Sequence, residues 1–266
     1  INSKEKLALT GTPIENSILE LWSIFDYIMP GFLANKTKFR EKYKIGEDFD
    51  DDTNLTLSKL RREVKPFILR RKKNEVLKDL PDKLENNIYI DLSDEEKKIY
   101  AALVKETKEE MEELVSAGFS KNKIQILTLL TRLRQVCIDP KIIFDNFNKT
   151  SSKIEHLVDV VKEAVSNGHK ILLFTSFRTA LNIVKANLSR EGITSYVIDG
   201  SVSSKKRQEL VDKFNKDDTN IFLIMLKSGG TGLNLTSADI VIHLDLWWNP
   251  QAENQATDRA HRIGQK

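Results

Sequence analysis

The sequence predicts an α/β protein in which helices cover both faces of a parallel sheet, together with an α-helical insertion. Three observations lead to this prediction. Strand-like and helix-like segments alternate from residue 153 onward, which is typical of parallel sheets. The strand-like segments are almost entirely apolar, for example "IFLIML" at 221–226, as strands buried on both faces are. Residues 94–138 carry a helical pattern between two predicted strands.

The first segments of the chain predict a short strand and a helix. "KLALT" at 6–10 is predicted to be a strand that leads into a turn at "GTP" (11–13). A helix is expected over 18–29, where apolar residues recur at helical spacing. Asn16 or Ser17 is expected to cap this helix, because both side chains accept hydrogen bonds from free backbone N–H groups.

The next segments lead into the helical insertion. Residues 31–82 are polar and contain helix and loop signals. "NNIYIDL" at 86–92 is predicted to be a strand. Ser93 and Glu96 have the spacing of a capping box, in which each side chain accepts a hydrogen bond from the other residue's backbone. The helical block over 94–138 is therefore expected to begin directly after Ser93.

The rest of the chain has the rhythm of a parallel sheet. The predicted strands cover 170–177, 194–199, 220–226 and 240–246. The predicted helices between them cover 153–167, 178–190 and 203–215. Ligands on such sheets bind beyond the carboxyl ends of the strands. The candidate site is therefore expected at "TSF" (175–177), "DGS" (199–201), "KSGGTG" (227–232) and "LWWNP" (246–250).

Composition excludes several classes of protein. With 266 residues, 40% apolar and 30% charged, the chain is globular. Its apolar runs are far shorter than the roughly 20 residues that a membrane span needs. Cys137 is the single cysteine, so no disulfide can form within the chain, as expected in a reducing compartment. The four histidines are scattered, and we expect no metal site. The chain begins without methionine and both ends look cut, so we expect it to be part of a longer protein.

Charge is unevenly distributed although the net charge is only +3. The run "RREVKPFILRRKK" at 61–73 mixes basic and apolar residues, so we expect one side of it to pack and the other to meet an anion. The acidic run "EDFDDD" at 47–52 is expected to be a solvated face.

The predicted terminal helix is unusually polar. Asn249 suits its N-cap and Pro250 its first position, and Gly264 suits its end. Its apolar stripe consists of alanines alone, which let a helix lie close to its neighbour: Ala252, Ala256 and Ala260.

A second stripe on this helix contains Gln255, Arg259 and Arg262 at the i, i+4, i+7 spacing. Two guanidinium groups that project together suit an oxyanion, which they can bind with defined geometry. The alternative is a surface ion-pair network with Asp258 or Glu253, and spacing alone does not separate the two interpretations.

The glycine-rich loop favours a phosphate or nucleic-acid site. Gly229, Gly230 and Gly232 follow a predicted strand directly and would let the backbone approach such a ligand closely. A structural tight turn is the alternative. The dinucleotide fingerprint G-x-G-x-x-G does not fit this loop, and no G-x-x-x-x-G-K-[ST] phosphate loop occurs in the chain.

Eight segments together resemble SWI/SNF-type DNA translocases, a branch of helicase superfamily two. In chain order they are "LALTGTPIENSILELWSIFDYIMPGFL", "PFILRRKKNEV", "LPDK", "LRQVCIDP", "ILLFTSF", "DGSVSSKKRQELVDKFN", "LIMLKSGGTGLNLTSADIVIHLDLWWNP" and "QATDRAHRIGQ". The chain is most similar to a prokaryotic, archaeal homologue of the recombination-type translocase. Thr231 departs from the pattern, because many relatives have valine or leucine there.

The resemblance implies an ATPase of two RecA-like lobes. The phosphate loop and the D-E-x-H box belong to the first lobe of this family, and this chain contains neither. The implied division is a tail of the first lobe at 1–18, a helical and linker segment at 19–82, the first strand of the second lobe at 83–93, a helical insertion at 94–148 and the second lobe at 149–266.

The resemblance also assigns roles to residues. Two arginines would reach the ATP phosphates across the lobe interface: Arg259 and Arg262. Four residues would contribute to binding of the cofactor, ATP: Gln255, Gly230, Gly232 and Asn234. Four would face DNA: Thr175, Ser176, Lys227 and Ser228. Three would couple hydrolysis to lobe movement: Thr10, Gly11 and Thr12.

The function implied is the C-terminal motor lobe of an ATP-dependent double-stranded DNA translocase that acts in DNA repair, recombination or remodelling. ATP and Mg²⁺ would be held mainly by the first lobe, and this chain alone would be inactive. The expected partners are double-stranded DNA, the first lobe and a DNA-bound protein cargo, with no membrane and a monomeric state. The location would be the cytoplasm of a prokaryote or the nucleus of a eukaryote. The alternative is a non-catalytic DNA-binding or protein-docking module that uses the basic face at 61–73.

Overall fold

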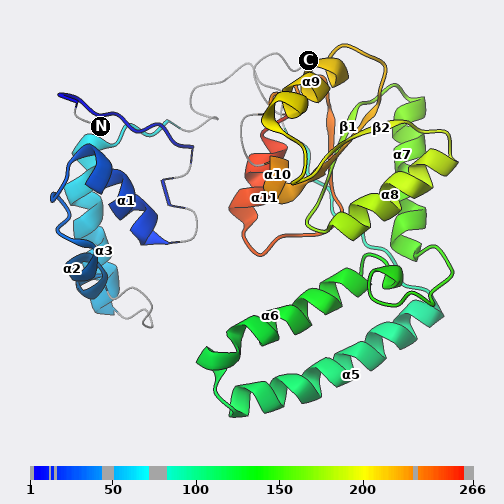
Figure 1. The fold of residues 1–266 in the computed structure, drawn as a ribbon, viewed down its shortest axis with the longest axis horizontal. Helices are drawn as coiled ribbons and strands as arrows, with labels where there is room; N and C mark the ends of the chain where they lie inside the picture. The colour runs from blue at the N-terminus through cyan, green and yellow to red at the C-terminus, as the bar shows by residue number, and fades with distance from the viewer. Residues whose placement is uncertain are drawn as a thin grey trace. The chain divides into compact units, whose positions relative to one another are not determined.

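The computed structural model describes residues 3–11, 13–14, 17–43, 51–71, 83–229 and 233–260. The chain forms two compact units, Ile1–Lys78 and Asp79–Lys266. Figure 1 shows that the first unit is helical and that the second contains a sheet covered by helices and a separate pair of long helices.

The first unit packs short helices around aromatic side chains. Its elements are α1 (Ile18–Ile28), α2 (Lys36–Lys42), α3 (Asp51–Val64) and η1 (Lys65–Phe67). Ser17 caps α1 by accepting a hydrogen bond from the backbone of Leu19, one of the two alternatives expected. The rings of Phe25 and Phe67 meet edge-to-face at 6.4 Å. The core of this unit contains Phe25 of α1 and Phe39 of α2, and Phe67 lies at its margin, 50% exposed.

The second unit contains a parallel sheet with the strand order β2-β3-β1-β4 among the described residues. The strands are β1 (Ile171–Thr175), β2 (Ser195–Ile198), β3 (Ile221–Met225) and β4 (Ile240–His243). Their register pairs Thr175 with Met225 and Phe174 with His243. The carboxyl ends of the strands therefore meet at one edge of the sheet, as the sequence predicts.

Helices cover both faces of this sheet, which confirms the predicted fold class. One face carries α7 (Ser152–Ser166) and α8 (Arg178–Arg190), and the other carries α9 (Ser204–Phe214) and α11 (Pro250–Thr257).

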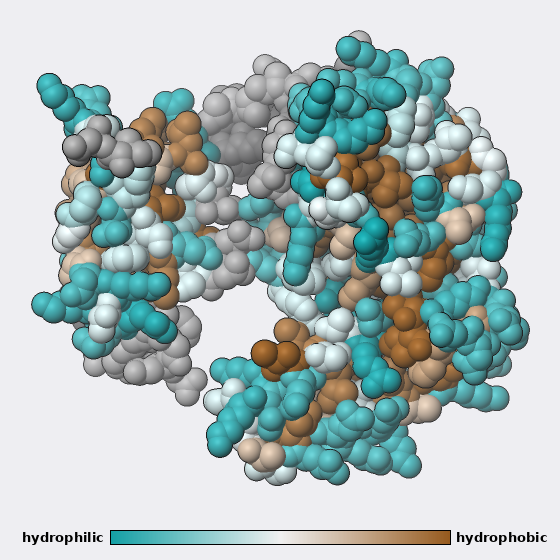
Figure 2. All heavy atoms as spheres, viewed as in Figure 1, coloured by the Kyte–Doolittle hydropathy of each residue, from teal (hydrophilic) through white to brown (hydrophobic). Residues whose placement is uncertain are grey.

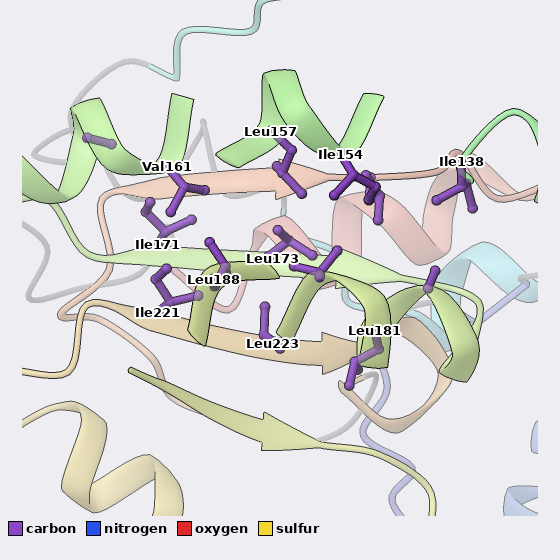
Figure 3. Packing of buried hydrophobic residues seen from close by; sticks show 14 residues of the cluster. Ile138, Ile154, Leu157, Val161, Ile171, Leu173, Leu181, Leu188, Ile221 and Leu223 are labelled. Atoms are coloured by element: carbon purple, nitrogen blue, oxygen red, sulfur yellow. The ribbon is translucent and has the colours of Figure 1, made fainter. Parts of the chain in front are cut away.

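Each central strand is buried on both faces because its successive side chains point to opposite sides. Along β1, Ile171 and Leu173 belong to the core under α7 and α8, whereas Leu172 and Phe174 belong to the core under α9 and α11. Figure 3 shows the first of these cores, in which side chains of α7 and α8 lie against those of β1 and β3. This packing makes the sheet a rigid support for the loops at its edges.

The helical block forms a hairpin rather than one continuous helix. Its helices are α5 (Asp94–Ser116) and α6 (Phe119–Val136), which pack side by side (Figure 1). The break falls at Gly118, whose φ of 115° is accessible to glycine and strained for other residues. The expected capping box is present at the start of α5, between Ser93 and Glu96. In Figure 2 hydrophilic residues dominate the outer side of this hairpin.

Two expected strands are not formed. Residues 6–10 and 86–92 contain no strand in the structure. Leu9 and Tyr89 are 90% and 92% exposed, so neither segment is buried in a sheet. A strand needs a neighbour whose N–H and C=O groups can pair with it, and among the described residues no strand pairs with either segment. Apolar patterning alone therefore overestimated strand content.

Two further expectations change in detail. The turn after β3 begins as a four-residue helical turn, α10 (Leu226–Gly229), rather than as an open loop. The terminal helix begins at Pro250 with Asn249 as its cap, as expected, but α11 ends at Thr257. Residues 261–266, which contain the predicted helix end at Gly264, lie outside the described residues.

Candidate functional site at the carboxyl edge of the sheet

Asp245 organises the carboxyl edge of the sheet. Its carboxylate is buried, and Oδ1 accepts hydrogen bonds from the Thr175 hydroxyl at 2.6 Å and from the Ser176 backbone at 2.9 Å. Oδ2 accepts a hydrogen bond from Nη2 of Arg134 at 3.1 Å. A buried carboxylate is costly unless it is hydrogen-bonded and paired with a positive charge. Asp245 meets both conditions, so the ends of β1 and β4 are joined at this residue.

Lys153 adds a second positive charge to this region. Burial lowers the pKa of its ammonium group, and the negative charge of Asp245 acts in the opposite direction. Cys137 lies close enough to Lys153 for their charges to interact, and burial raises the pKa of the Cys137 thiol. A buried thiol of this kind is held in its neutral form.

Aromatic rings and cations alternate along the same edge. Nζ of Lys227 lies 5.1 Å from the ring centroid of Trp247, and the Arg134 guanidinium lies 5.5 Å from that same centroid. Trp248, the next residue in the sequence, is 51% exposed. The backbone N–H of Trp247 donates to Oε1 of Glu253 at 2.5 Å, which ties the loop after β4 to α11.

Arg207 holds two loops of the edge together. Its side chain donates to three backbone carbonyls, those of Val202 at 2.9 Å, Ser228 at 3.2 Å and Asp199 at 3.4 Å. Ser228 belongs to the turn after β3, and Asp199 follows β2 directly. The start of the glycine-rich segment is therefore fixed against the neighbouring loop.

The terminal helix lies directly against the segment that follows the glycines. Ala256 is completely buried and Ala260 is 2% exposed, which confirms that the alanine stripe allows close packing. The backbone N–H of Leu235 donates to the carbonyl of Arg259 at 3.2 Å. Gln255 and Arg259 are partly exposed beside this stripe.

Asn234 contributes through its backbone to this arrangement. Its carbonyl accepts a hydrogen bond from the side-chain amide of Asn215 at 2.8 Å. Asn215 is the C-cap of α9, so the segment after the glycine-rich loop is held from two sides.

His243 links the end of β4 to α11. Its Nε2 lies 3.0 Å from the hydroxyl of Thr257, and its ring stacks on Phe174 at 5.5 Å. Burial lowers the pKa of His243, although the charge of Glu253 acts in the opposite direction. The imidazole is therefore neutral at pH 7, as a histidine packed against an aromatic ring should be.

The structure brings seven of the sequence-predicted site residues into one unit: Thr175, Ser176, Lys227, Ser228, Asn234, Gln255 and Arg259. Thr10 and Gly11 are exposed residues of the first unit. Four predicted residues lie outside the described residues: Thr12, Gly230, Gly232 and Arg262.

Three contributors to the edge were missed by the sequence analysis: Arg134, Asp245 and Arg207. Asp245 is the one acid in the predicted strand over 240–246 and lies near its carboxyl end, which is the kind of signal that could have identified it. Arg134 lies in an apolar helical stretch, "LLTRLRQVCI". Its partner is 111 residues away, so no local pattern identifies it.

Neither a metal cluster nor a membrane span is found in the part of the chain that the structure describes. No group of three or more His, Cys, Asp or Glu side chains there could hold a metal ion. None of the helices there is long and apolar enough to cross a membrane.

Comparison with known proteins identifies the family. Residues 1–142 match the SNF2-related domain, and residues 152–264 match the helicase conserved C-terminal domain. The chain is 41% identical to an uncharacterized ATP-dependent helicase of Mycoplasma pneumoniae, over 98% of this chain and 24% of that protein. It is 39% identical to the putative ATP-dependent helicase/translocase YwqA of Bacillus subtilis, over 98% of this chain and 29% of that protein.

A solved structure has the same fold. The Sulfolobus solfataricus SWI2/SNF2 ATPase core in complex with dsDNA is 34% identical, with a TM-score of 0.59 over 97% of this chain and 54% of that chain. The chain spans 24% and 29% of the lengths of the two bacterial relatives. Both family matches, the identities and the fold agree, and the chain therefore belongs to the SNF2-related (SWI2/SNF2) family.

Proposed function

We propose that this chain supplies the second motor lobe of an ATP-dependent translocase on double-stranded DNA. In this proposal two arginines of the segment that follows α11, Arg259 and Arg262, reach the phosphates of an ATP molecule bound by a first lobe. The observation that carries the proposal is the hydrogen bond between Leu235 and Arg259. It joins the segment after the glycine-rich loop to the turn that follows α11, and we propose that it couples the two.

The chemistry of phosphoryl transfer suits this arrangement. The reaction needs positioning and charge neutralisation, and an arginine that meets the transferring phosphate can contribute roughly 10³–10⁵ in rate. The backbone of Arg259 is held in place, because its carbonyl accepts from Leu235 and the next residue, Ala260, is buried. The described residues offer no carboxylate cluster for Mg²⁺. We propose that ATP and Mg²⁺ are held mainly by residues of the first lobe.

Burial divides the four predicted DNA-facing residues into two groups. Thr175 and Ser228 are 1% and 7% exposed, and the Thr175 hydroxyl already donates to Asp245. We propose that these two residues shape the edge. Lys227 is exposed and Ser176 is partly exposed, so these two would approach the DNA backbone. Contacts of this kind position a protein on DNA without reading its sequence.

The relatives support the same function. Two of them are named as ATP-dependent helicases, and the solved Sulfolobus core is bound to double-stranded DNA. We propose roles in DNA repair, recombination or remodelling as the setting for this activity. The lobe would act as a monomer together with the first lobe and a DNA-bound protein cargo.

Phosphate release by the longer protein tests the proposal. We expect ATP hydrolysis that duplex DNA stimulates, and no hydrolysis above the uncatalysed background by this chain alone. DNA binding should be independent of sequence and weaken steeply with salt. Hydrolysis by this chain alone, or a longer protein that DNA does not stimulate, would contradict the assignment.

The second candidate function is a non-catalytic module that binds through the basic face of the first unit. Arg61, Arg62 and Lys65 are all exposed there, beside Phe67, which is 50% exposed. This candidate predicts DNA or protein binding without ATP turnover in the longer protein. The same phosphate-release measurement therefore distinguishes the two functions.

A further inference from the structure

Arg134 connects the α5–α6 hairpin to the carboxyl edge of the sheet. It lies in the last turn of α6. Its guanidinium donates to Oδ2 of Asp245 at 3.1 Å and also to the carbonyl of Leu246. The Arg134 side chain is 19% exposed and that of Asp245 is 5% exposed, so little solvent screens this ion pair.

The same guanidinium is surrounded by three aromatic rings. It lies 4.7 Å from the ring centroid of Trp248, 5.4 Å from that of Phe177 and 5.5 Å from that of Trp247. A planar guanidinium can stack on rings while it donates hydrogen bonds in its own plane. Lysine cannot do both, because its ammonium is a compact point charge. The surroundings of Arg134 therefore require arginine and not merely a positive charge.

Asp245 extends the influence of Arg134 to β1. One carboxylate oxygen binds Arg134, and the other holds the Thr175 hydroxyl and the Ser176 backbone. Movement of the guanidinium would thus displace both the loop after β4, which contains Trp247 and Trp248, and the end of β1. Lys153 also interacts with the charge of Asp245, so the carboxylate keeps one cation nearby when Arg134 is removed. Loss of Arg134 should therefore disturb the edge more than it disturbs the fold.

We infer that Arg134 is a positioning residue through which the α5–α6 hairpin sets the geometry of the proposed DNA-facing edge. The inference rests on the proposed function, because it assumes that Lys227 and Ser176 meet DNA. It predicts that the hairpin and the edge move together, so that a displaced α6 changes how the protein responds to DNA.

The test uses three variants of the longer protein. Arg134→Ala removes the stacking, the ion pair and both hydrogen bonds. Arg134→Lys keeps a positive charge beside Asp245 but removes the planar stacking. It allows the same measurements if the alanine variant does not fold. Arg132→Ala is the matched control, because Arg132 lies on the same helix and its ion pair, at 3.8 Å, is with Glu106 of α5.

The first measurement is hydrogen–deuterium exchange of the edge amides, which requires neither ATP nor DNA. Ser176 donates its N–H to Asp245, and Trp247 donates its N–H to Glu253. In Arg134→Ala and Arg134→Lys we expect these amides to exchange at least about tenfold faster. In Arg132→Ala their exchange should match the wild type.

The second measurement is ATP turnover as a function of duplex DNA concentration. We expect the DNA concentration for half-maximal stimulation to rise about tenfold in both Arg134 variants, since displaced contacts weaken binding. The KM for ATP should change less than about twofold, because Arg134 does not face the nucleotide in this proposal. A merely destabilised protein would lose turnover at an unchanged half-maximal DNA concentration.

The outcomes separate the inference from the proposed function. If the Arg134 variants showed the same amide exchange and the same DNA response as Arg132→Ala, the inference would be overturned. A change in only one of these two measurements would overturn it as well. A wild-type protein without DNA stimulation would instead remove the proposed function. In that case the exchange rates alone decide whether Arg134 positions the edge.

Discussion

The two edges of the sheet are built in opposite ways. At the carboxyl edge, Asp245 and Arg134 join segments that are far apart in the sequence, and Lys227 remains exposed beside Trp247. At the amino edge, Asp239 accepts hydrogen bonds from the backbone of Lys170 at 2.9 Å and pairs with the His169 ring at 2.5 Å.

Polar groups of the amino edge are used to close loops. Nζ of Lys170 donates to the carbonyls of Phe214 at 2.6 Å and Asp217 at 2.5 Å. The carboxylate of Asp217 in turn accepts from the Tyr196 hydroxyl at 2.5 Å. The polar groups of the amino edge are therefore used within the fold, whereas the carboxyl edge leaves Lys227 and Trp248 exposed. This division is typical of open parallel sheets.

The largest expected effect concerns Arg262, in the segment that follows α11 and outside the described residues. In the longer protein Arg262→Ala should lower DNA-stimulated ATP turnover by about 10³-fold, since the arginine would stabilise charge in the transition state. Lysine should not restore activity, because it lacks the planar fork. Turnover and melting temperature of both variants check this.

A contrasting result for Arg262 would be diagnostic. Normal turnover together with a lowered melting temperature would mean that the residue only stabilises the fold. Arg262 would then have no catalytic role, and the proposed functional difference between the two edges would lose part of its support.

At the amino edge, Lys170→Met should affect stability alone. The change leaves the carbonyls of Phe214 and Asp217 without a charged donor, which should cost about 2 kcal/mol of unfolding free energy. ATP turnover at saturating DNA should stay within about twofold of the wild type. Urea unfolding and phosphate release measure the two quantities. Lys213→Met, at an exposed position of α9, is the control, and a strong loss of turnover in Lys170→Met would break the division between the edges.

A smaller effect is expected from pH at His243. Because burial lowers its pKa in the folded state below the ordinary 6.5, the unfolded state binds the proton first as pH falls. Folding stability should therefore decrease below pH 6.5, by up to about 1.4 kcal/mol per pH unit until the folded-state pKa is reached.

The variant His243→Gln isolates this contribution. Glutamine can still meet the Thr257 hydroxyl but does not titrate, so the acid slope of unfolding free energy should become shallower below pH 6.5. Unfolding measured at a series of pH values tests this. An unchanged slope would show that His243 is not protonated selectively in the unfolded state.

Local patterns were sufficient for much of the fold. Apolar runs identified β1 and β3, and the predicted helix over 178–190 coincides with α8. The capping box at Ser93 and the close packing of Ala256 and Ala260 were also predicted, because caps and periodicity depend on nearby residues.

Long-range geometry explains the failures. The segments 6–10 and 86–92 have apolar patterns, but a strand also needs a pairing partner, which sequence periodicity does not reveal. The Arg134–Asp245 pair depends on how the hairpin meets the sheet. The hydrogen bond from the Thr175 hydroxyl to Asp245 is also a long-range contact, which the resemblance that assigned Thr175 to the DNA-facing residues does not reveal.

The salt dependence of DNA binding by Lys227→Ala tests the central claim most directly. Lys216→Ala is the matched control, since Lys216 is equally an exposed lysine but follows α9 near the amino edge. If the carboxyl edge faces DNA, Lys227→Ala should reduce the slope of log affinity against log salt by about one, and Lys216→Ala should leave it unchanged. Equal slopes for both variants, or a larger change in Lys216→Ala, would contradict the assignment of the carboxyl edge as the DNA-binding surface.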